Sequence, residues 1–238
     1  MKILKIQALR GPNIWSIRRQ KLIQMRLDLE ELEERPTDKI DGFRERLENL
    51  LPTLIEHRCS EGCRGGFFQR VDRGTWMGHV IEHIALEIQT LAGMDVGFGR
   101  TRETKTPGVY NVVFNYLEEK VGIYAAKAAV KIAEALIAGE DYDLADDIQN
   151  MKEIREDVRL GPSTASIVDE AVSRDIPFIR LGRNSLIQLG AGVNQMRFQA
   201  TITCKTSNIA VDIACNKEQT KKMLDDASIP VAKGDICY

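Results

Sequence analysis

Hydrophobic and polar residues alternate along two stretches near the beginning of the chain. Residues 3–9 follow the period of two that is typical of a half-buried β-strand. Residues 22–29 repeat this alternation and predict a second strand, antiparallel to the first. A helix is the alternative interpretation there, because the glutamates of residues 30–34 are good helix formers. Over residues 43–51 the spacing changes to a helical one.

The central part of the chain carries the clearest helix. Residues 58–74 contain four glycines and show no period, which indicates a loop. Thr75 can cap a helix over residues 76–91, and Gly93 can end it. A hairpin and two helices are predicted next: strands at residues 96–102 and 109–114, an alanine-rich helix at 124–138, and a polar helix that ends near Arg159.

The pattern changes at Leu160, and we place a domain boundary there, between residues 1–159 and 160–238. Ser163 or Thr164 can cap a helix that reaches about residue 174. The elements predicted after it are short strands at residues 177–181 and 198–203, helical residues 208–227 that form two helices if they break near Asn216, and a new strand at Pro230. Alternating helices and strands are typical of an α/β domain, whereas the first part predicts an α+β domain.

The composition excludes several classes of protein. Of the 238 residues, 43% are hydrophobic and 29% are charged, as in folded domains. A formal net charge of −2 excludes a generally basic nucleic-acid-binding protein. No apolar run approaches the roughly 20 residues of a membrane span, and residues 1–6 do not form a signal peptide. Five cysteines without an export signal predict a cytoplasmic protein in which Cys204, Cys215 and Cys237 are small core residues.

The sequence His79-Val80-Ile81-Glu82-His83 is the sharpest sign of chemistry. On a helix, His79 and His83 project from one face and can share a metal ion. Glu82 lies beside them, where its carboxylate can take a proton from water. This H-x-x-E-H spacing is that of the inverted zinc peptidases, so we expect His79 and His83 as zinc ligands and Glu82 as the catalytic base.

A catalytic zinc needs a third protein ligand, and we expect Cys59 in that role. His57 is the second candidate, and Glu87 is either a ligand or the partner of a histidine. All three histidines of the chain lie between residues 57 and 83. A structural zinc is the alternative: Cys59 and Cys63 followed by His79 and His83 resemble a closed site of four protein ligands.

Two further motifs lie close to the predicted metal helix. Arg100 and Arg102 are candidates for binding a substrate that carries carboxylates, because guanidinium groups pair with them. The run Gly97-Phe98-Gly99 lacks the lysine and hydroxyl residues of a phosphate-binding loop and is interpreted as a tight bend.

Long stretches of the chain resemble the cyanophycin synthetase family, and the resemblance covers essentially the whole sequence. In the first part they are ALRGPNIWS at residues 8–16, CSEG at 59–62, GTWMGHVIEH at 74–83 and AGMDVGFGRTR at 92–102. In the second part they are LGPSTASIV at residues 160–168, SLIQLG at 185–190, QATIT at 199–203 and TSNIAVDIAC at 206–215.

The resemblance implies an enzyme with three modules that makes arginyl-polyaspartate, or cyanophycin, from aspartate and arginine with ATP and magnesium. An N-terminal domain holds the polymer, an ATP-grasp domain extends the backbone, and a third domain adds arginine. In some members the N-terminal domain also resembles a metal-dependent hydrolase that cuts polymer into primers. A homo-oligomer is the expected state of such a full-length enzyme.

For this chain the resemblance implies an α+β N-terminal domain followed by an incomplete α/β ATP-grasp N-terminal lobe. Ser163 and Ser166 are then candidates for contact with the polymer end or the incoming aspartate. The ATP site is expected mostly beyond Tyr238, so the chain alone is expected to lack ligase activity. A polymer-binding module without catalysis, holding a structural zinc or no metal, is the alternative function.

Overall fold

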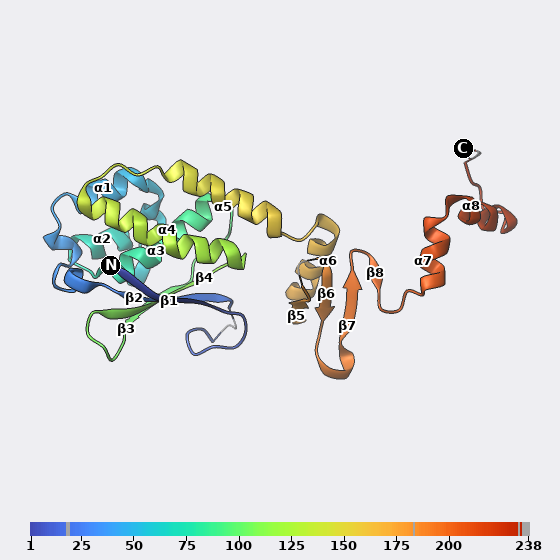
Figure 1. Cartoon of the computed structure of the whole chain (residues 1–238), viewed down its shortest axis with the longest axis horizontal. Helices are drawn as coiled ribbons and strands as arrows, with labels where there is room; N and C mark the ends of the chain where they lie inside the picture. The colour runs from blue at the N-terminus through green and yellow to red at the C-terminus, as the bar shows by residue number, and fades with distance from the viewer. Residues whose placement is uncertain (18–19, 183, 233, 235–238) are drawn as a thin grey trace. The chain divides into compact units, whose positions relative to one another are not determined.

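The computed structural model describes residues 1–17, 20–182, 184–232 and 234. It contains two compact units, Met1–Arg159 and Leu160–Tyr238 (Figure 1). No helix among the described residues is both long enough and apolar enough to cross a membrane.

The first unit is built on an antiparallel sheet of four strands. They are β1 (Lys2–Leu9), β2 (Leu22–Asp28), β3 (Gly99–Glu103) and β4 (Val109–Asn115), in the order β1-β2-β4-β3. The two alternating stretches therefore form antiparallel strands as predicted, and β2 pairs along its whole length with β4. The helical alternative for residues 22–29 is wrong. Only the glutamate-rich stretch after them is helical, as the 3₁₀ turn η1 (Glu30–Glu34).

Helices cover one face of this sheet (Figure 1). The central ones are α3 (Met77–Leu91) and α4 (Glu119–Ala138), which pack on each other and on the strands, and α5 (Leu144–Val158) packs on both. Two short helices, α1 (Phe43–Leu50) and α2 (Gly66–Asp72), complete the layer. Twelve of the fifteen residues of α3 are buried, so this helix lies inside the core. Its polar residues His79, Glu82, His83 and Glu87 line a cavity.

Two predicted helix starts in this unit differ from the structure. Helix α4 begins at Glu119, five residues before the predicted start, because Val121 and Gly122 already pack into the core. The N-cap of α3 is Trp76 rather than Thr75, and no side chain caps this end. The hydroxyl of Thr75 is instead engaged with His79, as described below.

The register of β3 on β4 decides which side chains face the helices. Thr101 lies opposite Val112, whose side chain belongs to the core. Arg100 and Arg102 lie opposite Val113 and Asn111, so their side chains leave the strand on the other face. The strand begins at Gly99 rather than at residue 96.

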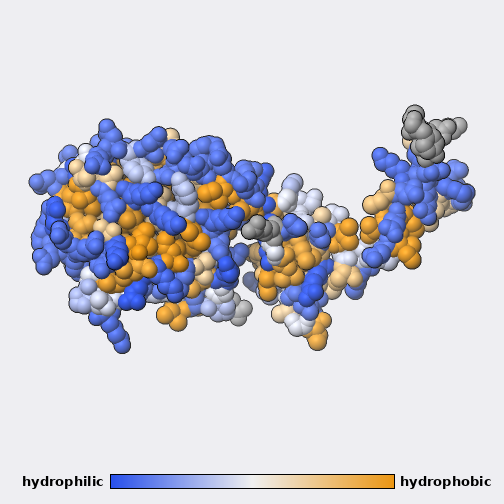
Figure 2. Space-filling view, viewed as in Figure 1, coloured by the Kyte–Doolittle hydropathy of each residue, from blue (hydrophilic) through white to orange (hydrophobic). Residues whose placement is uncertain are grey.

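The second unit has its own antiparallel sheet, in the order β5-β6-β7-β8. Its elements are α6 (Pro162–Ser173), β5 (Phe178–Arg180), β6 (Leu186–Leu189), β7 (Met196–Gln199), β8 (Ile202–Thr203), α7 (Asn208–Cys215) and α8 (Lys217–Asp226). Its core is small and consists of Val168, Ile187 and Phe198. Hydrophobic side chains are visible on its surface (Figure 2). Its exposed hydrophobic residues include Ile179, Val193 and Ile202.

Several predictions for this unit need correction. Helix α6 begins at Pro162 with Gly161 as its N-cap, so neither Ser163 nor Thr164 caps it. Strand β6 was not predicted, and residues 230–232 and 234 form no strand. The helix break at Asn216 is confirmed, because Asn216 ends α7 and caps α8. Cys204 and Cys215 are exposed rather than buried, and Cys237 lies outside the described residues.

Candidate metal centre

Three of the predicted side chains meet in the lining of a cavity in the first unit. His79 and His83 lie one turn apart on α3, and Cys59 reaches them from the preceding loop. One ligand atom from each of these three residues lies within 4.8 Å of the other two. The Sγ atom of Cys59 is 3.2 Å from Nε2 of His79. The residues predicted as zinc ligands are therefore brought together.

The loop that carries Cys59 is held in an unusual shape. Cys59 has a φ of +52°, in the left-handed region that costs a residue other than glycine about 1–2 kcal/mol. Behind it, the amide of Gly65 donates to the carbonyl of Ile55, and the amide of Phe67 donates to that of His57. A β-carbon on Gly66 would lie 2.1 Å from the carbonyl oxygen of Arg58. Glycine at position 66 thus allows the loop to lie against α2.

Each imidazole also contacts a side chain other than Cys59. Nδ1 of His79 lies 3.1 Å from the hydroxyl oxygen of Thr75. The ring of Phe67 stacks on that of His83, with centroids 4.2 Å apart. Burial, together with the charge of Arg70, lowers the pKa of His79 to about 4. The pKa of His83 also falls well below its ordinary value, chiefly because of burial. Both rings are therefore neutral at pH 7 and keep a lone pair for a metal.

Glu82 is buried between the helix and strand β3. Its side chain is 5% exposed, and this burial raises its pKa to about 7. The hydroxyl of Thr101 donates to Oε2 of Glu82 at 2.6 Å. This hydrogen bond and the positive charges of Arg102 and Arg100 lower the pKa of Glu82, but burial has the larger effect. On the other side, a β-carbon on Gly99 would lie 2.2 Å from Oε1 of Glu82. A carboxyl that titrates near neutrality can both accept and return a proton.

The other candidate ligands are engaged elsewhere. Nε2 of His57 lies 2.7 Å from Oε2 of Glu87, and the hydroxyl of Thr53 donates to the other oxygen of this carboxylate. Burial raises the pKa of Glu87, but the hydrogen bonds from His57 and Thr53 outweigh it and hold the pKa below its ordinary value. Cys63 is exposed and lies outside the group of three donors. Among the described residues the group therefore offers a metal three ligands and not four.

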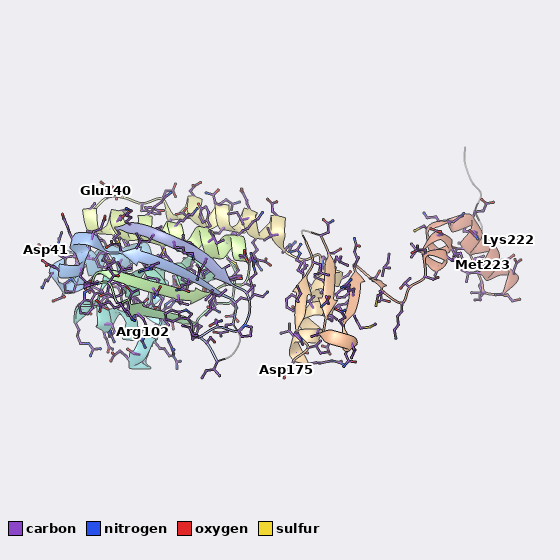
Figure 3. All side chains as sticks on the ribbon, turned by 60° about the horizontal axis from the view of Figure 1, so that its bottom comes forward. Asp41, Arg102, Glu140, Asp175, Lys222 and Met223 are labelled. Carbon is purple, nitrogen blue, oxygen red and sulfur yellow. The ribbon has the colours of Figure 1, made fainter. Side chains whose placement is uncertain are left out.

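The cavity beside these residues has a volume of about 920 Å³. Four arginines line it: Arg58, Arg70, Arg100 and Arg102, the last of which is labelled in Figure 3. The two arginines predicted to bind substrate thus lie at the cavity, although they leave β3 on the face opposite Thr101. Ser163 and Ser166 belong to the second unit, where they are exposed near the start of α6 and do not line this cavity.

Sequence reasoning missed the residues that position the charged groups. In β3 it singled out Arg100 and Arg102, whereas the residue between them contacts Glu82. Strand alternation could have found Thr101, because neighbours of outward-facing residues point toward the core. Gly99 was interpreted as part of a bend. Its role depends on a contact between segments 17 residues apart, which no local pattern reveals.

Comparison with known proteins gives consistent results. Residues 24–138 match the family of the cyanophycin synthase-like N-terminal domain. The cyanophycin synthetase of Geminocystis herdmanii is 55% identical to this chain over the whole of the chain, and the match covers 28% of the length of that enzyme. The enzyme of the same name from Trichormus variabilis is 55% identical over 99% of this chain and 26% of its own length. That of a Synechocystis species is 53% identical over 98% of this chain and 27% of its own.

The chain thus spans roughly a quarter of the length of these relatives and matches their N-terminal part. The matched family domain includes strand β3, which contacts Glu82, and the whole of α3. The chain belongs to the cyanophycin synthetase family.

Proposed function

We propose that this chain is the polymer-handling N-terminal part of a cyanophycin synthetase, and that its first unit hydrolyses amide bonds of arginyl-polyaspartate at a zinc ion. The single observation that carries the proposal is the convergence of Cys59, His79 and His83 next to a buried carboxyl with a pKa near 7. A cleaving domain in such an enzyme would supply the short chains from which polymer synthesis starts.

The donor set fits zinc. Two neutral imidazoles and one thiolate are ligands that zinc prefers, and three protein ligands leave a coordination position open, as in catalytic sites. Zinc held there would supply a Lewis acid that makes water more acidic and polarises a carbonyl group. The exposed position of Cys63 favours this open site over a structural site of four ligands.

Glu82 is assigned the proton transfers of the hydrolysis. In the first step its carboxylate takes a proton from the attacking water while the oxygen adds to the amide carbon. In the second step Glu82 gives this proton to the leaving nitrogen as the C–N bond breaks, so that the products are a carboxylic acid and an amine. A group with a pKa near the working pH is suited to both steps.

The remaining assignments concern the substrate and the second unit. Arg100 and Arg102 would bind the carboxylates of the polymer at the mouth of the cavity. The second unit would be the beginning of an ATP-grasp domain, with Ser163 and Ser166 near the polymer end. ATP, magnesium, aspartate and arginine would then be needed only by the longer enzyme, whose homo-oligomeric state and cytoplasmic location are part of the same proposal.

The test is the Glu82→Gln variant of the 238-residue chain. Its zinc content should equal that of the parent chain, because Glu82 is not in the donor group. Its rate of cleavage of arginyl-polyaspartate, followed by chromatography of the products, should fall about 10²–10⁴-fold with the loss of the general base. Unchanged cleavage, or a parent chain that contains no zinc after purification, would contradict the proposal. Full zinc without any cleavage by the parent would favour the structural alternative.

A further inference from the structure

The two titratable groups that the proposed hydrolysis leaves unused lie in a chain that ends on a metal ligand. Nδ1 of His57 is 2.8 Å from Nδ1 of His83, and Nε2 of His57 is 2.7 Å from the carboxylate of Glu87. The rings of His57 and His83 have their centroids 5.1 Å apart. Three side chains are thus connected by two short contacts in the order Glu87, His57, His83.

The chemistry of these groups allows one set of hydrogen bonds that leaves a nitrogen of His83 free for a metal. Glu87 has a pKa below its ordinary value and, as a carboxylate, can only accept, so Nε2 of His57 donates to it. The Nδ1 atoms of His57 and His83 lie 2.8 Å apart, so in the arrangement that leaves Nε2 of His83 free for a metal, Nδ1–H of His83 donates to Nδ1 of His57. This leaves the lone pair of His83 on Nε2, on the opposite edge of the ring from His57.

The fold holds each member of this chain in place. Glu87 lies one turn beyond His83 on α3, is 3% exposed, and also accepts from Thr53. The carbonyl of His57 accepts from the amide of Phe67, and the ring of Phe67 covers His83. Because His57 and Cys59 share one short loop, the residue that orients one ligand lies two positions before another ligand.

We infer that His57 and Glu87 are positioning residues of the metal centre: Glu87 holds His57 in one tautomer, and His57 holds His83 with Nε2 available for the metal. This inference rests on the proposed function, because it assigns the two residues to the zinc site proposed above. Hydrogen bonds from metal-binding histidines to carboxylates or other acceptors fix the ring and increase its basicity, and their loss typically costs 10–100-fold in metal affinity. Here the carboxylate acts through a second histidine.

The test measures zinc affinity of the 238-residue chain by competition with a chromophoric chelator. His57→Ala should bind zinc 10–100-fold more weakly than the parent, still with one ion per chain. Glu87→Gln, which keeps the volume and one acceptor but loses the charge, should lose about tenfold. The double variant should match His57→Ala alone, because both residues act through one contact to His83. The visible spectrum of the cobalt-substituted protein should shift in each of these variants.

Two control variants distinguish a positioning role from direct binding of the metal and from a general effect of lost charge. Glu56→Gln removes an exposed carboxylate next to His57 that pairs with Arg64, and it should leave zinc affinity unchanged. Cys59→Ser removes a ligand and should abolish stoichiometric binding. The inference is overturned if His57→Ala binds zinc like the parent, if it behaves like Cys59→Ser, or if the two losses add in the double variant. If His57→Ala does not fold by circular dichroism, Glu87→Gln alone decides. A parent chain without zinc contradicts the proposed function instead.

Discussion

At the scale of single residues, the candidate site depends on side chains that carry no charge. Glu82 is the proposed base, but its position is set by Gly99 on one side and by the hydroxyl of Thr101 on the other. A buried carboxyl can transfer protons efficiently only if it is held in the correct position relative to the reacting atoms. The absence of a β-carbon at residue 99 therefore leaves the space that the Glu82 carboxyl occupies.

Replacing Gly99 by alanine should move Glu82 while leaving the zinc ligands in place. The added β-carbon would lie 2.2 Å from Oε1 of Glu82, so the carboxyl must rotate away. We expect cleavage of arginyl-polyaspartate to fall by about 10²-fold, as in misplacement of a catalytic group by about 1 Å. Zinc content should not change, because the three atoms nearest to the added β-carbon all belong to Glu82 and not to a proposed ligand.

Gly97→Ala is the matched control, since a β-carbon there meets no atom within 4 Å. Its cleavage rate and its zinc content should both equal those of the parent chain. Equal rates for the two alanine variants would show that the space beside Glu82 is not required for the reaction.

At the scale of elements, the sequence predicted the parts that depend on local periodicity. The strand alternation of residues 3–9 and 22–29 and the helical face that carries His79 and His83 were predicted because each follows from a repeat of two or of 3.6 residues. The proximity of Cys59 to that helix was also expected, because the stretch that carries Cys59 was interpreted as a loop able to fold over the helix.

The contacts that complete the site could not be predicted, for two physical reasons. Residues 58–74 show no period and were predicted to be a loop, but they contain the short helix α2. The shape of the segment before α2 depends on a left-handed Cys59 and on the close approach of Gly66 to Arg58. The role of Thr75 was predicted wrongly because a hydroxyl at a helix start can satisfy either the backbone or a side chain. Here His79 lies within 3.1 Å of it, and the helix begins without a side-chain cap.

The junction between this loop and α2 gives an element-scale prediction. In Gly66→Ala the new β-carbon would lie 2.1 Å from the carbonyl oxygen of Arg58, so the loop must shift away from the helix. We expect the free energy of unfolding of the first unit to fall by about 1–3 kcal/mol, as for other overpacked sites, and zinc affinity to fall because Cys59 moves with the loop. Urea unfolding and chelator competition measure the two effects.

The control for this variant is Gly11→Ala, in the loop between β1 and β2, where a β-carbon meets nothing within 4 Å. It should change neither quantity. A Gly66→Ala chain that is destabilised but binds zinc as tightly as the parent would mean that the loop adjusts without displacing Cys59.

At the scale of the whole molecule, the chain consists of two units with very different cores. The candidate metal ligands all come from the unit Met1–Arg159, whose core extends over both the sheet and its helices. Among the described residues of the other unit, the core cluster has three buried side chains and a few partly buried neighbours. A metal that binds only the folded first unit should therefore stabilise that unit and not the other.

Zinc should accordingly shift one unfolding transition and leave the other unchanged. Both tryptophans, Trp15 and Trp76, belong to the first unit, so their fluorescence follows its unfolding alone. At free zinc of 100 times the dissociation constant, the first unit should gain about 2.7 kcal/mol, seen as a higher urea midpoint that a chelator reverses. Cys59→Ser should show no shift.

The second unit needs a fluorescence reporter of its own. Phe178 packs against the core of that unit, so Phe178→Trp provides one. In the same variant, Trp15 and Trp76 are both replaced by phenylalanine. In this variant the fluorescence transition should be the same with zinc and with chelator. A zinc-dependent shift of this second transition would mean that the metal binds outside the Cys59, His79 and His83 group or that the two units unfold together. An unshifted transition in the first unit, with zinc present in excess, would remove the metal centre on which the proposed hydrolysis depends.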